Sequence, residues 1–566
     1  MAFKLRKIKN NIRKFIPKPI INYYHYLLAF VGAVKYKFSS RNLIVIGVTG
    51  TKGKTTVCYL IYDLLHKLGV KIAISSSDAF LFDGETSEKI SRNATPGTTP
   101  GRWFLQKFLK EALNKNCEVA VLEITSEGLM QNRHSFIDFD IVEFINIHPE
   151  HIEHHGGYEK YKESKAKLFL NLLKGKNKYF RGKMIKKTII ANLDDKESDY
   201  FLNFPAQEKI TYSIEVDTGN ESLNIHPEKI QLSPKGVTFK INDLLFASKL
   251  IGNQGVYNIL ASFVAIKSIG IPISDLKQPL AEFNGLPGRF EMFQSRKCRV
   301  IIDYAHTPVS VEELYKNILE IFKPRKLLCL IGSDGGCRDK WKRPVIGEIA
   351  AKYCSKIVIS DVNPYDEDPF VIMRAIEQGV KKYFEAFDFK KDYEIIQDRK
   401  EAILNLVNSA EKEDIIVTIG KGVENTIEMN GYSIPWNEKE VVLEILGSSK
   451  YQQKIIQNIA PEFINGVNIK KINSEKVVKN KVENKAVIDR FSKSANIISK
   501  LFAPSNNLNK KTIKPTRHLA GTKLMAKKII NTKKESVKKT TNLTTVPPVG
   551  RLRTKNIKSS KSKKKR

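Results

Sequence analysis

The chain has 566 residues, of which 42% are hydrophobic and 9% aromatic, and its formal net charge is +35. This length exceeds one compact core and predicts several domains, while the apolar content excludes a wholly disordered or fibrous protein. The charge belongs to the two ends: residues 1–43 hold 10 Lys/Arg and no Asp/Glu, residues 450–566 hold 31 and 5, and the part between them is nearly neutral. That balance excludes a nucleic-acid binder that carries its positive charge on the fold itself.

The first predicted element is a helix within a basic, amphipathic N-terminal segment, residues 1–43. Residues 19–34 are apolar, which is shorter than the roughly 20 residues that a membrane-spanning helix needs. No small-residue cleavage site follows the run, so export is not expected. Two alternatives remain: the helix packs on the body of the protein, or it lies in an anionic membrane surface. Seven basic residues precede or begin the run: Lys4, Arg6, Lys7, Lys9, Arg13, Lys14 and Lys18.

The middle of the chain predicts two successive α/β domains, because short β-rich runs alternate with helical periods. The first domain is expected at 44–285, as a central domain with a mostly parallel sheet. The second is expected at 286–449, as a Rossmann-like C-terminal domain. Residues 450–566 are rich in Lys, Asn, Ser and Thr and predict a disordered basic tail. The runs are strands at 43–48 and 119–124 with a helix at 55–70, and later strands at 300–305, 326–332, 356–360 and 414–420.

Six cysteines are scattered without a CxxC pair, so neither a disulfide scaffold nor a zinc ribbon is expected, and a reducing cytoplasm is favoured. The cysteines are Cys58, Cys117, Cys298, Cys329, Cys337 and Cys354.

A glycine-containing loop directly follows the first strand and precedes the first helix of the central domain. Such a loop turns backbone N–H groups toward phosphate oxygens, Lys54 adds a charge, and Thr55 offers a hydroxyl to Mg²⁺. The loop therefore predicts nucleotide binding, against the alternative of a glycine turn with an incidental lysine. It departs from the generic P-loop spacing because Val48 stands where the first glycine would be. The predicted ATP-binding loop residues are Gly50, Thr51, Lys52, Gly53, Lys54, Thr55 and Thr56.

The loop TGTKGKTT resembles that of the Mur ligase family, and further segments of the chain resemble the same family in the expected order. Among its members, the chain is most similar to the UDP-N-acetylmuramoyl-tripeptide synthetases, through DYAHTP, GGCRDKWKRP and GKGVE. The similar segments are 121–133, 144–169, 191–195, 252–262, 286–291, 303–308, 335–344, 363–369 and 420–424.

This resemblance implies that 44–285 is a P-loop central ATPase domain. It also implies an ATP-dependent, ADP-forming ligase of peptidoglycan precursor synthesis that works in the cytoplasm as a monomer. Such an enzyme adds an amino acid, here expected to be a diamino acid, to a muramoyl-dipeptide-type acceptor through an acyl phosphate. The family's N-terminal uridine-binding domain is not matched, because the chain reaches its P-loop strand by Leu43. Whether the acceptor carries UDP therefore stays open.

For the metal and nucleotide, the resemblance implies Mg²⁺ held by Thr55, Glu123, His151 and a carbamate that CO₂ forms on Lys165. It also implies contacts with adenine, ribose or phosphate of ATP by Asn258, Arg289 and Asp303, and by Asn192 and His306. Lys54, Lys165, Glu123 and His151 would be the catalytic residues. Two alternatives are a zinc site made by His148, His151, His154 and His155, and a merely solvated Lys165.

For the substrates, the resemblance implies that the acceptor contacts Thr98, Thr99, Thr125, Gln131 and Arg133, and Glu127 replaces a family histidine. The amino acid would contact Arg338, Asn363, Gly420 and Glu424. Family members that add diaminopimelate carry N-P-R where this chain has N-P-Y at 363–365. A carboxylate at Glu424 suits a distal ammonium group, which favours a diamino acid.

Two alternatives remain open for the function, and the roles of the two tails are a separate question. The chain could be a related ligase with another acceptor, such as a folylpolyglutamate synthetase or a polymer-forming amino-acid ligase. It could instead be a non-catalytic polyanion- or membrane-binding protein. Independently of the body, 1–43 could bring the protein to the inner face of the membrane, and 450–566 could bind nucleic acid or another polyanion, or only solubilise the chain.

Overall fold

A computed structural model describes residues 18–447, except 85–90, 93–98, 102, 151, 221–222, 337 and 388–391. All of them lie in one compact unit, Met1–Asn465. The predicted basic tail, 450–566, and the first 17 residues lie outside the described residues. The predicted domain boundaries stay predictions.

The first main sheet is mostly parallel, as predicted, and β1 lies at its centre between β6 and β5. In the described sheet only β3 pairs antiparallel with its neighbours, β2 and β4, at one edge. Alternate residues of β1 enter different cores, with Ile46 on one face and Val45 on the other. The strands, in spatial order, are β11 (Asn224–Ile225), β10 (Glu208–Tyr212), β9 (Thr188–Asn192), β6 (Ile141–Phe144), β1 (Ile44–Thr49), β5 (Val119–Glu123), β2 (Ile72–Ser75), β3 (Ala79–Phe82) and β4 (Ser91–Arg92).

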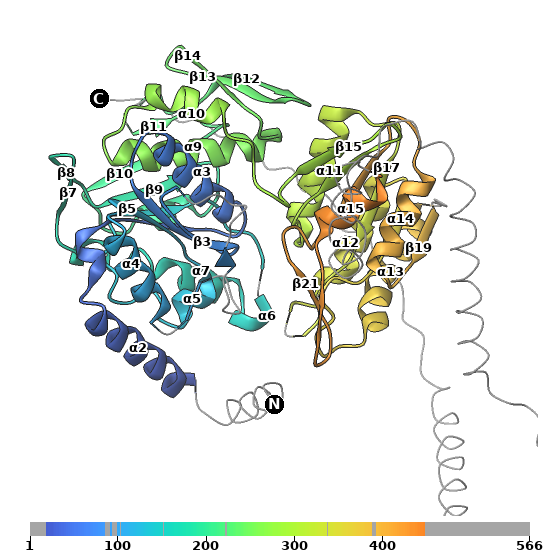
Figure 1. Cartoon of the computed structure of the whole chain (residues 1–566), viewed down its shortest axis with the longest axis horizontal. Coiled ribbons are helices and arrows are strands. Elements are labelled where there is room, and N and C mark those ends of the chain that lie inside the picture. Colours follow the sequence, from blue (N-terminus) through green and yellow to red (C-terminus); the bar gives the residue numbers. More distant parts are fainter. Residues whose placement is uncertain are drawn as a thin grey trace, which may run out of the picture. The chain divides into compact units, whose positions relative to one another are not determined.

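Helices cover both faces of this sheet (Figure 1). One face packs against α3 (Lys54–Lys67) and α9 (Gly252–Ser268). The other packs against α4, α5, α7 and α8. The remaining helices of this region are α2 (Lys18–Lys35), α4 (Phe104–Asn114), α5 (Ser126–Met130), α6 (Ile152–His155), α7 (Tyr158–Ala166), α8 (Ser198–Leu202) and α10 (Lys277–Ala281), with 3-10 turns η1 (Ser39–Asn42), η3 (Leu172–Lys174) and η4 (Ile273–Leu276).

Two small antiparallel sheets complete this part of the chain. One contains β12 (Glu228–Ser233), β13 (Gly236–Ile241) and β14 (Leu244–Ser248), and the other contains β7 (Lys178–Phe180) and β8 (Lys183–Ile185). Neither was predicted from the sequence. Phe239 and Phe246 of the three-stranded sheet are buried and join the core beneath α9.

The second main sheet is also parallel except for β15, which pairs antiparallel with β16. Helices α11, α12 and α13 close the core on one face of the sheet, and α14 and α15 close the core on the other. The strands, in spatial order, are β15 (Glu291–Gln294), β16 (Arg299–Ile302), β20 (Ile415–Thr418), β17 (Leu327–Ile331), β18 (Lys356–Ile359) and β19 (Asp392–Ile395). The other elements are α11 (Pro308–Phe322), α12 (Lys342–Tyr353), α13 (Pro369–Phe387), α14 (Arg399–Ser409), α15 (Glu438–Ile445) and the hairpin of β21 (Thr426–Glu428) and β22 (Ser433–Pro435).

The expectation about cysteines is wrong for one pair. A disulfide joins Cys329, in β17, to Cys354, which follows α12, whereas Cys58, Cys117 and Cys298 are free and buried. The two bonded cysteines are 25 residues apart, and only the packing of α12 on the sheet brings them together. Sequence spacing gave no signal for this bond.

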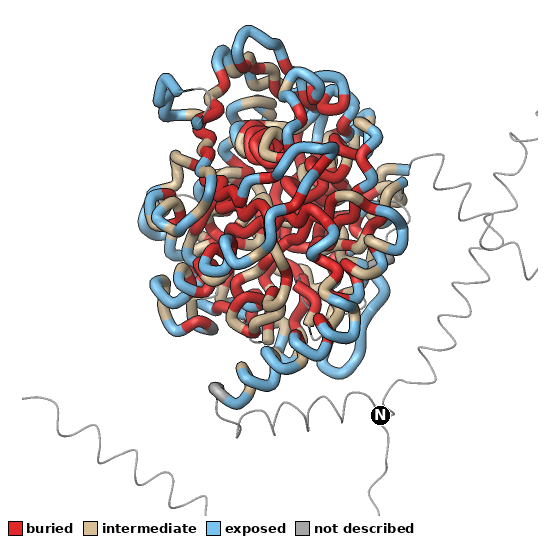
Figure 2. The backbone as a smooth tube through the Cα atoms, turned by 90° about the vertical axis from the view of Figure 1, so that its left-hand side faces the viewer, coloured by how far each residue is buried: buried red, intermediate tan, exposed pale blue. Residues whose placement is uncertain are grey.

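The apolar run near the N-terminus forms α2, as predicted. None of the described helices is long and apolar enough to cross a membrane. The helix packs on α4 through small residues: Ala29 and Ala33 are buried, and a Cβ at Gly32 would lie 2.6 Å from Trp103 Cβ. Figure 2 shows how the buried residues concentrate in the interior strands while the outer helices carry exposed residues.

Glu143, in β6, gives the fold a pH-dependent stability. The residue is fully buried beside Val48, and neither carboxyl oxygen has a hydrogen-bond partner among the described residues. Burial therefore raises its pKa well above the ordinary value. The folded chain then keeps a proton that the unfolded chain releases, so stability falls as pH rises from the unfolded toward the folded pKa, by at most about 1.4 kcal/mol per pH unit.

We expect Glu143→Gln to remove this decline. Urea unfolding at several pH values between 5 and 8 measures it, with Glu111→Gln, an exposed carboxylate on α4, as the control. Parallel curves for the parent and Glu143→Gln would show that Glu143 is ionised in the folded protein.

Candidate active site

The glycine-containing loop lies at the carboxyl end of β1 and leads into α3. Gly53 has φ +86°, and a Cβ there would lie 2.6 Å from Asn258 Oδ1. A Cβ at Gly50 would clash with Ile145. Both positions therefore require glycine, and the backbone of the loop lies tightly against its neighbours. The first N–H groups of α3 have no partner within the helix, which is the usual arrangement for binding a phosphate.

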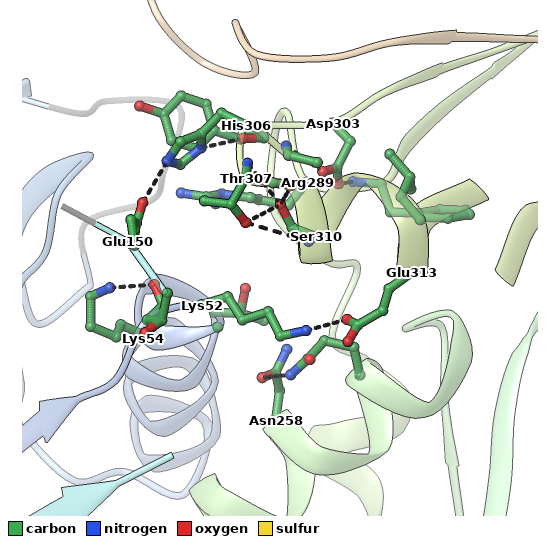
Figure 3. Close-up of a pocket in the computed structure, with 18 of the residues that line it drawn as sticks. Lys52, Lys54, Glu150, Asn258, Arg289, Asp303, His306, Thr307, Ser310 and Glu313 are labelled. Atoms are coloured by element: carbon green, nitrogen blue, oxygen red, sulfur yellow. Dashed lines mark hydrogen bonds and ion pairs between the residues drawn. The ribbon is translucent and has the colours of Figure 1, made fainter. Parts of the chain in front are cut away.

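Asn146, which follows β6, holds the loop in shape. Its Oδ1 accepts the N–H groups of Thr51 at 3.1 Å and Lys52 at 3.0 Å, and its Nδ2 donates to the Lys52 carbonyl at 2.9 Å. Lys54 Nζ donates to the Thr51 carbonyl at 2.9 Å (Figure 3). Sequence reasoning did not single out Asn146, although its place directly after a strand next to β1 was a usable signal.

Glu123 ends β5, in register with Val48 of β1, and so lies beside the loop. Its carboxylate is buried and accepts hydrogen bonds from Thr55 Oγ1 at 3.0 Å and from the Ser77 N–H and hydroxyl at 2.8 Å each. A carboxylate next to a threonine hydroxyl is a set of hard oxygen ligands that fits Mg²⁺. Ser77 is an addition to the predicted set.

Lys165, on α7, lies directly beneath the loop. Its Nζ donates to the Gly50 carbonyl at 2.6 Å, and the residue is 1% exposed. Burial, together with the charge of Lys54, lowers the pKa of Lys165 well below its ordinary value. The side chain is therefore not a solvated lysine, and its neutral amine is the form that can react with CO₂.

The predicted metal ligand His151 and the side chain of His154 lie outside the described residues. Of the other two histidines, His155 shares hydrogen bonds with Ser126 and Ser164, at 3.1 and 3.3 Å. Burial, and to a smaller extent the positive charge of Lys52, lowers the pKa of His148 to about 4. Within the described residues, no group of three or more His, Cys, Asp or Glu side chains could hold a metal ion.

Arg289 and Asp303 come from the region of the second sheet. The Arg289 guanidinium is 3.5 Å from Thr55 Oγ1 and 3.7 Å from Asp78, and it lies over the ring of Tyr304. Asp303 accepts the N–H groups of Phe290 at 2.8 Å and Ala305 at 2.7 Å, which fixes the turn after β16.

Two further polar side-chain contacts join the same two regions of the chain. Lys52 pairs with Glu313 of α11, and Glu150 lies 3.2 Å from the Nε2 atom of His306 (Figure 3). Sequence reasoning did not single out Glu150 or Glu313. A smaller cavity of about 150 Å³ beside Lys52 is lined by Asn192, Asn258 and Tyr257, among others.

The predicted acceptor residues form one hydrogen-bonded chain, apart from Thr98, which lies outside the described residues. Thr99 and Thr125 share a hydroxyl hydrogen bond of 2.9 Å. Arg133 donates to the carbonyl of Thr99 and to the side chain of Gln131, at 2.7 Å for the latter. Gln131 in turn donates to Glu127 at 2.9 Å.

The predicted amino-acid residues follow the carboxyl ends of parallel strands of the second sheet and so meet at one edge. Asn363 follows β18 and donates to Glu424 at 2.8 Å and to Asp334 at 3.0 Å. Glu424 and Gly420 follow β20, and Lys421 between them donates to Glu424 at 2.7 Å. Arg338 lies 4.0 Å from Asp334. Asp334 and Lys421 were not among the predicted residues.

One cavity of about 310 Å³ collects most of these groups. Thr55, Lys165, Thr99, Gln131, Arg133, Asn363 and Glu424 do not line it. The predicted residues that line it are Thr51, Lys52, Gly53, Lys54, Thr56, Glu123, Thr125, Asn258, Arg289, Asp303 and Arg338.

Comparison with known proteins gives matches along the described part of the chain. A family profile described as the Mur ligase middle domain matches residues 48–266, and one described as the Mur ligase, glutamate ligase domain matches residues 288–422. The UDP-N-acetylmuramoyl-L-alanyl-D-glutamate–2,6-diaminopimelate ligase of Halalkalibacterium halodurans is 32% identical over 76% of this chain and 84% of its own length. The enzyme of the same name from Caldanaerobacter subterraneus is 32% identical over 75% and 82%.

A folylpolyglutamate synthase structure from Mycobacterium tuberculosis has the same fold, with a TM-score of 0.55, 13% identity, and coverage of 70% of this chain and 92% of that one.

Proposed function

The chain belongs to the Mur ligase family, and from that premise we propose that it joins an amino acid to a muramoyl-dipeptide acceptor with ATP, for peptidoglycan precursor synthesis. It is an ATP-dependent, ADP-forming ligase. The amino acid is a diamino acid, and the acceptor carboxylate is activated as an acyl phosphate.

One observation carries this proposal: a single cavity is lined by the glycine-containing loop, the carboxylate of Glu123 and the charged groups after β16 and β17. Lys54 and the N-terminus of α3 would bind the phosphates of ATP, and Glu123 with Thr55 would hold Mg²⁺. Bound Mg²⁺ supplies charge that offsets the phosphate oxygens. Arg289, over Tyr304 and next to Thr55, would supply a guanidinium to the transferring phosphoryl group.

The reaction divides into two displacements. An oxygen of the acceptor carboxylate attacks the γ-phosphorus, and the bond to the departing ADP oxygen breaks. The amino nitrogen then attacks the acyl carbon, loses a proton, and expels inorganic phosphate. Thr125, at the rim of the cavity and hydrogen-bonded to Thr99, supports placing the acceptor next to the loop.

A diamino acid is supported by the charges at the far side of the cavity. Arg338 lines it and can pair with an α-carboxylate, while Asp334 lines it and can accept a distal ammonium. Glu424 is reached through Tyr304, whose hydroxyl donates to it at 3.1 Å. Asp334 lines the cavity and Glu424 does not, so Asp334 is the carboxylate that an ammonium in the cavity would contact directly.

Three finer proposals accompany this function. Lys165 is carbamylated and contributes to the second Mg²⁺ site together with His151. Residues 1–43 contact an anionic membrane surface, and residues 450–566 bind a polyanion. The buried, hydrogen-bonded position of Lys165 supports the first of these.

The purified protein with ATP and Mg²⁺ tests the proposal against a panel of acceptors. We expect ADP release only when a muramoyl dipeptide and a diamino acid are both present, and the panel compares acceptors with and without the UDP group. Norleucine in place of lysine is the matched control, since it lacks only the distal ammonium. ADP release with a folate-type acceptor and glutamate, and none with muramoyl dipeptides, would assign the chain to another ligase activity.

A further inference from the structure

Helix α2 buries its small residues and exposes most of its large apolar ones, which is the opposite of the usual arrangement. Its small residues Ala29, Gly32 and Ala33 face the body, whereas most of its large apolar residues face outward. Tyr23 is 69% exposed and Ile20 is 59% exposed. Surface helices of globular proteins normally bury their large apolar residues and expose polar ones. Figure 1 shows α2 at the edge of the body, beside α4 and α5.

The exposed residues form one continuous apolar stripe. They recur at three- and four-residue spacing, which places them on one face of a helix. Phe30 and Tyr26 flank the stripe and contact Phe136, with ring centroids 5.3 and 4.9 Å apart. No charged residue interrupts α2 between Lys18 and Lys35. The outer stripe consists of Ile20, Tyr23, Tyr24, Leu27, Val31 and Val34, all at least 45% exposed.

Basic residues precede and follow this stripe in the sequence. Lys35 and Lys37 are exposed at its C-terminal end, and six further Lys/Arg residues lie within 1–17. The whole segment 1–43 has ten basic residues and no acidic residue. An apolar helix face with tyrosines and flanking cations is the pattern of a helix that lies in a membrane interface.

We propose that α2 docks the protein on an anionic lipid surface, with the stripe from Ile20 to Val34 in the acyl boundary and the flanking lysines among the headgroups. A second copy of the chain fits this face less well, because it would bring ten more cations against ten with no acidic residue in the segment to offset them. Packing on the body and docking on a membrane use opposite faces of α2, so the two alternatives for this helix are compatible. The proposal is independent of the reaction that the cavity catalyses.

Co-sedimentation of the full-length protein with phosphatidylcholine vesicles, with and without phosphatidylglycerol, tests it. We expect binding to the anionic vesicles, and at least about a tenfold lower partition coefficient for Leu27→Gln/Val31→Gln, because two apolar side chains no longer enter the bilayer. This variant keeps every charge, so the basic tail contributes equally to both proteins. Leu244→Gln/Leu245→Gln, at an exposed apolar pair on β14, is the matched control and should bind like the parent.

Equal binding of the parent and the α2 variant would overturn the proposal. So would a concentration-dependent dimer, seen by sedimentation velocity without lipid, that the same variant abolishes, because it would assign the stripe to a second copy. ADP release with soluble substrates should be unchanged in the variant, which separates a failure here from a failure of the proposed reaction.

Discussion

Glu123→Gln is expected to lower turnover by about 10²–10³-fold with the fold intact, because it removes a negative charge placed to hold Mg²⁺ against the phosphates. The amide keeps the shape of the side chain but cannot accept from Thr55 and Ser77 as a carboxylate does. The rate of ADP release with both substrates at saturation measures the effect. Glu118→Gln is the control, since Glu118 directly precedes β5 and so lies at the amino end of the strand that Glu123 ends.

Lys54→Ala is expected to lower turnover by a similar factor. Lys54 lines the cavity and begins α3, so its ammonium can move from the Thr51 carbonyl to a phosphate. Lys67→Ala, at the last residue of the same helix, is its control. Near-normal turnover in Glu123→Gln or Lys54→Ala would contradict the assignment of the site.

Lys165→Ala is expected to be inactive and to recover partly when short carboxylic acids are added. Burial at 1% exposure leaves an ammonium poorly solvated, and a carbamate on this nitrogen would supply an anion that a small carboxylate can replace. The measurement is ADP release with and without added acid. Lys160→Ala, an exposed lysine on the same helix, is the control and should keep its activity.

A second readout does not depend on activity. After incubation with ¹³C-bicarbonate, the parent should give a carbamate carbon signal by NMR that Lys165→Ala lacks. Full activity in Lys165→Ala would reject the modified lysine, as would the same carbamate signal in both proteins.

The strands and the nucleotide loop could be predicted because their signals are local. The run 43–48 became β1, Ile44–Thr49, and the loop after it contacts β5 and β6 as parallel pairing requires. Glu123 could be placed beside the loop for the same reason, because it ends a neighbouring strand.

The rest of the site depends on contacts between segments far apart in sequence. Asn146 holds the loop through hydrogen bonds across more than 90 residues, and Glu313 reaches Lys52 across 261. No spacing of residues in the sequence signals either contact. Lys421 stood inside a recognised segment, yet only the fold shows that it donates to Asn363 and Glu424.

Hydropathy alone could not predict that α2 exposes most of its large apolar residues. A run of apolar residues does not tell which face is buried, and here small residues allow the close approach of α2 to Trp103. The disulfide between Cys329 and Cys354 likewise depends on the packing of α12 against β17.

The central claim is that this cavity joins a carboxylate to an amine through an acyl phosphate, and the fate of the carboxylate oxygen tests it most directly. The acceptor is labelled with oxygen-18 in its terminal carboxylate and converted with ATP, Mg²⁺ and the diamino acid. We predict that one labelled oxygen appears in inorganic phosphate for each amide formed, because the second displacement breaks the bond between the acyl carbon and that oxygen. Label in AMP, or amide formation with unlabelled phosphate, would contradict the account.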